Sequence, residues 1–187
     1  MLWETFLAAL DLVRHYVQQG SQTELSLTGI GESLMHPQFV EAVAEARAVI
    51  GPDRPLVITT NGLLLDEAMC RDLAPFRPQV FVSLHRPEKA GPAVELAKKY
   101  GILHGVNASA AISAFNWAGQ IDWHVSAPRT KCEYLRAGWG VVLVDGRVTT
   151  CCLDASGAGV VGTVWDIPEK LMLKPYSLCS TCHMTPP

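Results

Sequence analysis

Apolar residues recur at two spacings along the first part of the chain, and segments with the two spacings alternate. A spacing of three to four predicts amphipathic helices over residues 2–18, 39–50, 65–73 and 90–100. Between them, alternating or β-branched runs predict strands over residues 24–28, 56–60, 80–83 and 102–107. A further apolar helix over 109–118 and a strand over 121–125 continue the pattern. Gly20 and Gly51 follow the first two helices and predict where each ends.

Strands that alternate with helices of this length predict right-handed crossovers and a parallel α/β sheet, either open or curled as part of a barrel. The carboxyl ends of parallel strands meet at one edge, and functional groups gather there. The residues that follow the predicted strands are therefore candidate site residues: Gly29, Gly31, Glu32, Asn61, Ser83, His85 and Asn107.

The pattern changes at Pro128, which predicts a first domain over residues 1–127 and a small second domain over 128–187. Residues 138–151 contain two β-branched runs joined at Asp145-Gly146, a dipeptide typical of two-residue hairpin turns. Cys151 follows the second run directly.

Cysteines set the chemistry of this second domain. Five of the chain's six cysteines lie there: Cys132, the adjacent pair Cys151 and Cys152, and the C-x2-C pair Cys179 and Cys182. A C-x2-C pair lets two thiolates reach one ion or cluster, so we expect a metal site rather than disulfides or free thiols. The spacing alone is compatible with zinc and with an iron-sulfur cluster. Cys70, alone in a predicted helix, is interpreted as a small buried hydrophobe.

Composition narrows the class of protein. With 49% apolar and 18% charged residues over 187 positions, the chain can bury a core, and its net charge of -3 argues against a broad nucleic-acid footprint. The sequence has neither an apolar run of about 18 residues, the length of a membrane span, nor a signal peptide pattern. We therefore expect a cytoplasmic protein without nucleic-acid or membrane partners, in a compartment that keeps thiols reduced.

Three motifs after predicted strands resemble the radical S-adenosylmethionine (radical SAM) superfamily. The segment LTGIGESLMHPQF at residues 27–39 is similar to the second strand and "GGE" turn, TTNG at 59–62 to the third strand ending, and VSL at 82–84 to the fourth. The resemblance implies that the turn with Gly29, Gly31 and Glu32 holds the methionine amino group of S-adenosylmethionine, and that Ser83 approaches its ribose. Asn61 belongs to the same implied cofactor site.

The cysteine spacing resembles the auxiliary-cluster domain of that superfamily, called SPASM or, in its shorter form, twitch. The pattern C-x(9–15)-G-x4-C is met by Cys132, Gly146 and Cys151, and the later C-x2-C by Cys179 and Cys182. The resemblance implies that these four cysteines hold one [4Fe-4S] cluster, with Cys152 as a spare ligand and zinc as the alternative metal. The implied fold is a partial parallel (β/α) barrel with a small cysteine-rich β-hairpin domain.

The superfamily's C-x3-C-x2-C motif, which ligates the cluster that cleaves the cofactor, is not found in the 187 residues. We therefore expect a truncated or degenerate protein that does not cleave S-adenosylmethionine alone, and a second copy or a partner chain that covers the missing first strand. Two alternatives stay open. One is a fragment or split half of a radical SAM enzyme that modifies a peptide or small molecule. The other is a zinc-stabilised binding protein without enzymatic activity.

Some residues keep two interpretations. Glu32 either binds a cofactor amine or caps the helix that follows it. His36 is expected in a turn, and His183, beside Cys182, is expected to be incidental to the metal site because four cysteines suffice.

Overall fold

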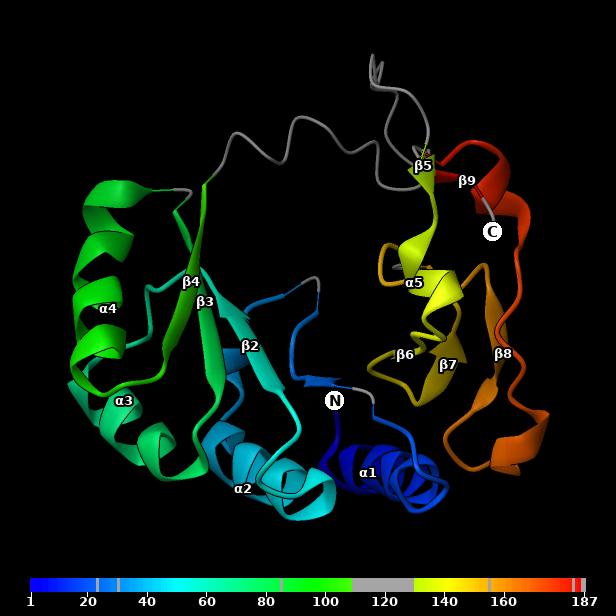
Figure 1. Cartoon of the computed structure of the whole chain (residues 1–187), viewed down its shortest axis with the longest axis horizontal. Coiled ribbons are helices and arrows are strands. Elements are labelled where there is room, and N and C mark those ends of the chain that lie inside the picture. The colour runs from blue at the N-terminus through cyan, green and yellow to red at the C-terminus, as the bar shows by residue number, and fades with distance from the viewer. Residues whose placement is uncertain are drawn as a thin grey trace. The chain divides into compact units, whose positions relative to one another are not determined.

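The computed structural model describes residues 1–22, 24–29, 31–84, 86–108, 130–154, 156–182 and 184–185. These residues divide into two compact units: residues 13–108, and residues 1–12 together with the described residues after 129 (Figure 1). The predicted helix over 109–118 and strand over 121–125 lie outside the described residues, as do His85 and His183.

The unit of residues 13–108 is built on a four-stranded parallel sheet. Its strands are β1 (Leu25–Ser26), β2 (Leu56–Thr60), β3 (Gln79–Leu84) and β4 (Leu103–Ala108), in that order. Helices α2 (Phe39–Ile50), α3 (Glu67–Leu73) and α4 (Pro87–Lys99) connect successive strands (Figure 1). The predicted parallel α/β alternation is therefore confirmed for the described part of the chain.

Local sequence sets where these elements begin and end. Helix α1 (Trp3–Gln18) ends before Gly20, which has a φ of 87°, and α2 ends at Gly51, with a φ of 77°. Both glycines adopt the left-handed conformation that commonly ends helices. Helix α4 begins earlier than its apolar spacing predicts, because Pro87 stands in the first turn, where a missing N–H costs nothing.

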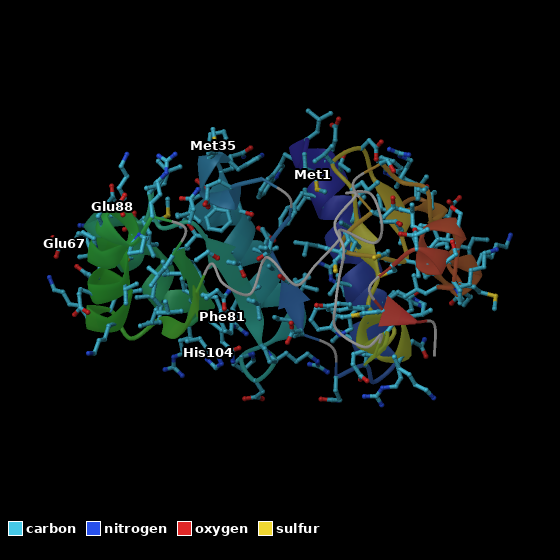
Figure 2. All side chains as sticks on the ribbon, turned by 90° about the horizontal axis from the view of Figure 1, so that it is seen from above. Met1, Met35, Glu67, Phe81, Glu88 and His104 are labelled. Atoms are coloured by element: carbon cyan, nitrogen blue, oxygen red, sulfur yellow. The ribbon has the colours of Figure 1, made fainter. Side chains whose placement is uncertain are left out.

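The sheet has one face covered by helices and one half-buried face. Ile58, Val80 and Val82 are fully buried, whereas the alternating residues Thr59 and Phe81 are half-buried. Side chains of a strand alternate between faces, so the second pair shares the less covered face. There the Phe81 ring lies beside the His104 ring at 5.0 Å, edge to face (Figure 2). A Cβ at Gly105 would lie 2.9 Å from the Phe81 ring, so glycine makes this packing possible.

Arg47 joins the end of α2 to the loops beside it. Its guanidinium donates hydrogen bonds to the backbone carbonyls of Phe76, Gly51, Arg54 and Arg77 over 2.7–3.1 Å. Partial burial lowers the pKa of Arg47. One side chain thus satisfies four carbonyls from two segments, the loop after α2 and the end of η2 (Ala74–Phe76).

The other unit contains two small sheets. Strand β5 (Thr130–Lys131) pairs in parallel with β9 (Met184–Thr185), and β6 (Val141–Val142), β7 (Arg147–Thr149) and β8 (Val160–Thr163) form an antiparallel sheet. Short helices α5 (Glu133–Arg136), η5 (Pro168–Lys170) and η6 (Ser177–Ser180) connect them. Strands β6 and β7 form the predicted hairpin, with Gly146 in its turn at a φ of 87°. Val148 and Val164 pack with Ala9 and Leu12 in the core of this unit.

No helix in the described ranges has the length and apolar character of a membrane span.

Candidate functional site

Glu32 links the ends of the first two strands at the carboxyl edge of the parallel sheet. One carboxylate oxygen accepts a hydrogen bond from the Leu34 N–H at 3.2 Å, and the other from the Asn61 N–H at 2.8 Å. The first bond caps the short helix η1 (Ser33–Met35). The capping interpretation of Glu32 is therefore confirmed, and the second bond brings the sequence-predicted residues Glu32 and Asn61 together. Each oxygen retains a lone pair for a further donor.

Gly29 and Gly31 lie just before Glu32, and the space beside the α-carbon of each is open. An added Cβ would meet no atom within 4 Å at either glycine, and neither has a positive φ. Neither packing nor backbone conformation among the described residues demands glycine here. Two glycines that the fold does not require leave room for a ligand to approach the backbone.

Gly62, in contrast, is required by the fold. It has a φ of 79°, and an added Cβ would lie 3.1 Å from Ala93 and 3.2 Å from Val82. Its N–H donates to the buried Thr60 hydroxyl at 3.0 Å, while the Asn61 side chain accepts from the Leu63 N–H at 2.9 Å. The turn after β2 is thus a rigid element that fixes Asn61 beside Glu32.

Ser83 and Asn107 lie opposite one another at the carboxyl ends of β3 and β4. Ser83 is half-buried and Asn107 is exposed. The predicted residues Gly29, Gly31, Glu32, Asn61 and Ser83 therefore all follow or end strands at one edge of one sheet, as their positions in the sequence indicated. His36, which ends η1, accepts from the Gln38 N–H at 3.2 Å and is the turn residue expected.

Three of the cysteines after residue 129 accept hydrogen bonds from backbone N–H groups through their sulfurs. Cys132 caps α5 by accepting from the Leu135 N–H at 3.5 Å, and Cys151 accepts from Leu153 at 3.4 Å. Cys182 accepts from Met184 at 3.3 Å. Such bonds stabilise thiolate sulfur and are the kind that surround cysteine-ligated clusters.

The thiols of this group lie within electrostatic reach of one another. The pKa of Cys182 is raised, first by burial and then also by the charges of Cys151, Cys132 and Cys179. A thiol hydrogen bond from Cys152 lowers the pKa of Cys151 and raises that of Cys152 itself. The charges of these thiols therefore act on one another. No disulfide joins any of the chain's six cysteines, all of which are among the described residues.

The described side chains, as they stand, contain no group of three or more His, Cys, Asp or Glu close enough to hold a single metal ion. Cys70, outside the frame, is fully buried, and burial raises its pKa to about 11. Its interpretation as a small hydrophobe is confirmed.

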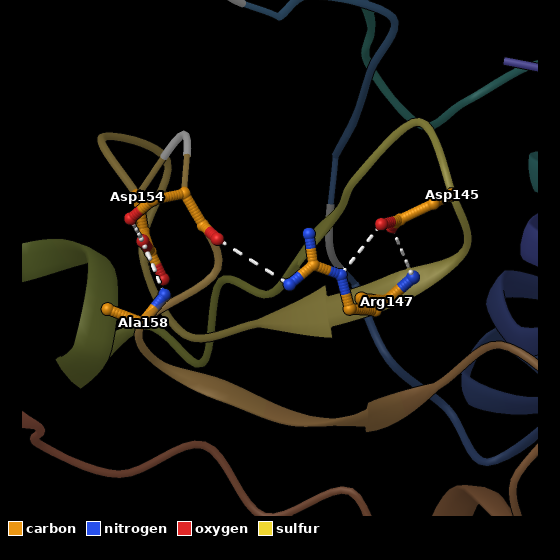
Figure 3. A network of polar contacts seen from close by, with 5 residues as sticks. Asp145, Arg147, Asp154 and Ala158 are labelled. Atoms are coloured by element: carbon orange, nitrogen blue, oxygen red, sulfur yellow. Dashed lines mark hydrogen bonds and ion pairs between the residues drawn. The ribbon is translucent and has the colours of Figure 1, made fainter.

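Asp154 anchors the loop that carries Cys151 and Cys152. Its carboxylate, 1% exposed, accepts from the Thr149 hydroxyl at 2.6 Å, the Gly159 N–H at 2.7 Å and the Ala158 N–H at 2.9 Å (Figure 3). Burial by itself raises the pKa of Asp154, but these hydrogen bonds outweigh it and the net pKa is lowered. Asp154 was missed in the sequence; the signal is an acid followed by Ala-Ser-Gly-Ala-Gly, which is typical of a tight loop.

Beside this loop, the Arg147 side chain binds Asp145 at 2.7 Å and reaches the Ser156 carbonyl at 3.5 Å. Figure 3 shows that Arg147 bridges the hairpin turn and the Asp154 loop. The hairpin and the cysteine-bearing loop are therefore held to one another by polar contacts of their own.

Tyr176 is the second residue that sequence reasoning missed. Its ring packs against the backbone of Gly159, where an added Cβ would lie 2.8 Å from the ring. Its pKa is raised, first by burial and then by the charge of Cys151, and its hydroxyl has no hydrogen-bond partner among the described residues. The Tyr176 ring therefore lies against the loop that follows Cys151 and Cys152.

Two solved structures share this fold. The structure of BtrN, a radical SAM enzyme, in complex with AdoMet and 2-DOIA matches with a TM-score of 0.72 and 19% identity, over 88% of this chain and 65% of BtrN. Selenomethionine BtrN in an open conformation matches with a TM-score of 0.60 and 19% identity, over 88% and 63%. The chain thus spans less than two thirds of the length of BtrN.

No protein-family model matches the sequence, and no curated protein matches it. At 19% identity the two structures show the fold, which is radical-SAM-like as predicted. The auxiliary-cluster domain and its ligands stay predictions.

Proposed function

We propose that this chain is the S-adenosylmethionine-binding and auxiliary-cluster part of a radical SAM protein. The observation that carries the proposal is the fold it shares, over 88% of its length, with BtrN, whose structure was solved in complex with AdoMet. Two groups of residues support it: the strand ends around Glu32, and the cysteine frame around Cys151.

At the sheet edge, Glu32 would accept hydrogen bonds from the methionine ammonium of the cofactor. Its carboxylate is already oriented by the Leu34 and Asn61 N–H groups, which leave lone pairs for a charged donor. The open space at Gly29 and Gly31 allows the cofactor to approach the backbone of the turn. The Ser83 hydroxyl, on β3 two strands from β1, would hydrogen-bond to the ribose of the cofactor.

In the second domain, Cys132, Cys151, Cys179 and Cys182 would hold one [4Fe-4S] cluster, which supplies electron transfer when bound. Residues of the chain hold the sulfurs in place: Leu135, Leu153 and Met184 donate N–H groups to three of them. Zinc is the alternative metal, because four thiolates also suit it.

Reductive cleavage of S-adenosylmethionine needs the C-x3-C-x2-C cluster, and these 187 residues contain no such motif. Chemistry on a substrate therefore requires that segment from elsewhere, in the same protein or in a partner. Without it, the chain's own role is to bind cofactor and partner and to relay electrons.

Calorimetry with S-adenosylmethionine tests the cofactor site. The wild-type chain should bind it, and Glu32→Ala should weaken binding by at least about tenfold, because a charge-assisted hydrogen bond contributes roughly 1.5–3 kcal/mol. Glu45→Gln, an exposed position on α2, is the matched control and should leave the affinity unchanged. A wild-type chain that binds no S-adenosylmethionine would refute the proposal.

Metal analysis of anaerobically purified protein tests the cysteine frame. About four irons per chain with a broad brown absorbance, lost in Cys179→Ala and kept in Cys70→Ala, is the expected result for a [4Fe-4S] cluster. Stoichiometric zinc without visible absorbance would replace this part of the proposal with a structural zinc site.

We also propose that a second copy or a partner chain pairs with the sheet at β1. This strand has only two paired residues and stands at one edge of the four-stranded sheet, the position where a further strand can add. Light scattering should give a mass above that of one chain, and a monomer would contradict the idea.

A further inference from the structure

Asn61 and Gly62, in the turn that follows β2, form an Asn-Gly dipeptide. Asparagine before glycine is especially prone to deamidation, because glycine has no side chain that hinders attack by its own backbone nitrogen. In this reaction the Gly62 nitrogen loses its proton and bonds to the side-chain carbonyl carbon of Asn61, and the side-chain amide leaves as ammonia. Water then opens the resulting succinimide ring to aspartate or isoaspartate. The reaction is a substitution followed by hydrolysis, so it needs no oxidant or reductant.

The turn holds the proton that the attacking nitrogen has to lose. The Gly62 N–H donates to the Thr60 hydroxyl oxygen at 3.0 Å, and Thr60 is only 2% exposed. A buried N–H gives up such a bond only at the cost of being left without a partner. Gly62 is itself buried, with the Ala93 and Val82 side chains 3.1 and 3.2 Å from the position of an added Cβ. The packing around Gly62 therefore keeps its N–H on the Thr60 hydroxyl.

The other reactant, the Asn61 side chain, is restrained as well. Its amide oxygen accepts from the Leu63 N–H at 2.9 Å, and the Asn61 backbone N–H donates to the Glu32 carboxylate at 2.8 Å. Each bond limits the rotations that bring the side-chain carbonyl carbon onto the Gly62 nitrogen. Both partners of the reaction are thus held by hydrogen bonds that an unfolded chain lacks.

We propose that Asn61 is a latent deamidation site, which the Thr60 hydroxyl suppresses in the folded chain by binding the Gly62 N–H. Deamidation places a second carboxylate at position 61, beside the Glu32 carboxylate, and like charges at such a distance repel one another. The isoaspartate product also adds a methylene group to the backbone of a turn that is closely packed at Gly62. Modification therefore separates the ends of β1 and β2, whether or not this edge of the sheet binds a cofactor.

The test is to incubate the full chain in mildly alkaline buffer and to follow Asn61 by peptide mass spectrometry, through the mass increase that replacement of NH2 by OH produces. Folded wild type should deamidate at least about tenfold more slowly than the same chain in urea, since freeing a buried N–H from its partner costs about that factor. Thr60→Val, which keeps the shape of threonine without its hydroxyl, should speed deamidation of the folded chain by about tenfold for the same reason.

Thr59→Val is the matched control, because it makes the same substitution at a half-buried position one residue earlier and leaves the partner of the Gly62 N–H in place. Its Asn61 should react at the wild-type rate. Equal rates in folded and urea-unfolded wild type, or equal rates in the two variants, would overturn the inference. So would faster deamidation in Thr60→Val that is fully accounted for by a larger unfolded fraction in its urea unfolding curve.

Hydrogen exchange of the wild type, measured by nuclear magnetic resonance, covers the case in which Thr60→Val does not fold. Exchange and deamidation both begin with loss of the Gly62 amide proton. That proton should therefore exchange at least about tenfold more slowly in the folded chain than in the unfolded chain. Exchange of the Gly62 N–H at the unfolded rate would contradict the protection assigned to Thr60.

Discussion

Replacing Asp154 by alanine should destabilise the cysteine-bearing loop far more than its place in a surface loop suggests. The carboxylate is buried and accepts hydrogen bonds from Thr149, Gly159, Ala158 and, at 3.3 Å, the Ser156 hydroxyl. Ser156 and Ala158 are exposed, so water can replace the lost acceptor there. Thr149 and Gly159 are buried and would be left without a partner.

The magnitude follows from those two buried donors. Each unsatisfied buried group costs about 1–3 kcal/mol, so Asp154→Ala should cost roughly 3–4 kcal/mol. Asp154→Asn should cost less, because its amide oxygen keeps one acceptor while its NH2 group faces a donor. Asp145→Asn is the control, since Asp145 forms an exposed ion pair with Arg147 and surface pairs contribute little.

Hydrogen exchange measured by mass spectrometry on peptides covering residues 147–163 is the assay. At 1.36 kcal/mol per factor of ten, a loss of about 3 kcal/mol speeds exchange of the Gly159 amide about a hundredfold. Exchange in Asp154→Ala no faster than in Asp145→Asn would refute the role given to Asp154.

The effect should also depend on pH in a defined direction. The net pKa of Asp154 is below its ordinary value of 3.8, so the folded chain binds fewer protons than the unfolded chain in the interval between the two values. The stabilisation is therefore complete above about pH 4 and is lost as the pH falls through the folded-state pKa. The difference between wild type and Asp154→Ala should shrink in acid; a constant difference down to the lowest pH would contradict the sign.

Three further predictions concern the unit of residues 13–108. Gly62→Ala should lower the free energy of unfolding by at least about 1 kcal/mol, because Gly62 has a positive φ and the Ala93 Cβ is close. Gly91→Ala, which has open space around it inside α4, should raise the free energy of unfolding by about 0.5–1 kcal/mol. Urea unfolding of the two variants measures both changes. Arg47→Lys should lower the free energy of unfolding by about 2–4 kcal/mol, because one ammonium cannot reach four carbonyls. An unfolding curve close to that of the wild type would contradict this prediction. Cys70 should resist iodoacetamide at pH 8 until the protein unfolds, because its raised pKa and burial suppress the thiolate; rapid native-state labelling would show otherwise.

The parallel sheet could be predicted from sequence because its strands and helices follow the periodicity of burial. Residues 56–60 and 39–50 were predicted with the bounds that the structure gives. The first strand was predicted over residues 24–28 but pairs only over Leu25–Ser26. Beyond it, Thr28 uses its hydroxyl, in place of its backbone, to accept from the Thr59 N–H at 2.9 Å. Side-chain substitution for a backbone bond leaves no trace in a hydrophobic pattern.

Some residues of the candidate site could likewise be predicted from the sequence, and others could not. Gly29, Glu32 and Asn61 could be placed at one edge because parallel strands all end on the same side of a sheet. Asp154 and Tyr176 could not, because their roles depend on which polar atoms share a buried space across a loop. An acid in a glycine-rich loop and a tyrosine before a cysteine have no periodic signal; only the packing against Gly159 relates them.

A loop whose shape is maintained by its own carboxylate does not need a metal to fold. Small zinc modules fold only as the ion binds, so for them assembly and folding are one event. Here Asp154 holds the turn around Cys151 and Cys152 with bonds internal to the polypeptide. The polypeptide can therefore fold around Cys151 and Cys152 without a metal, and the proposed cluster would be inserted into a loop that is already formed.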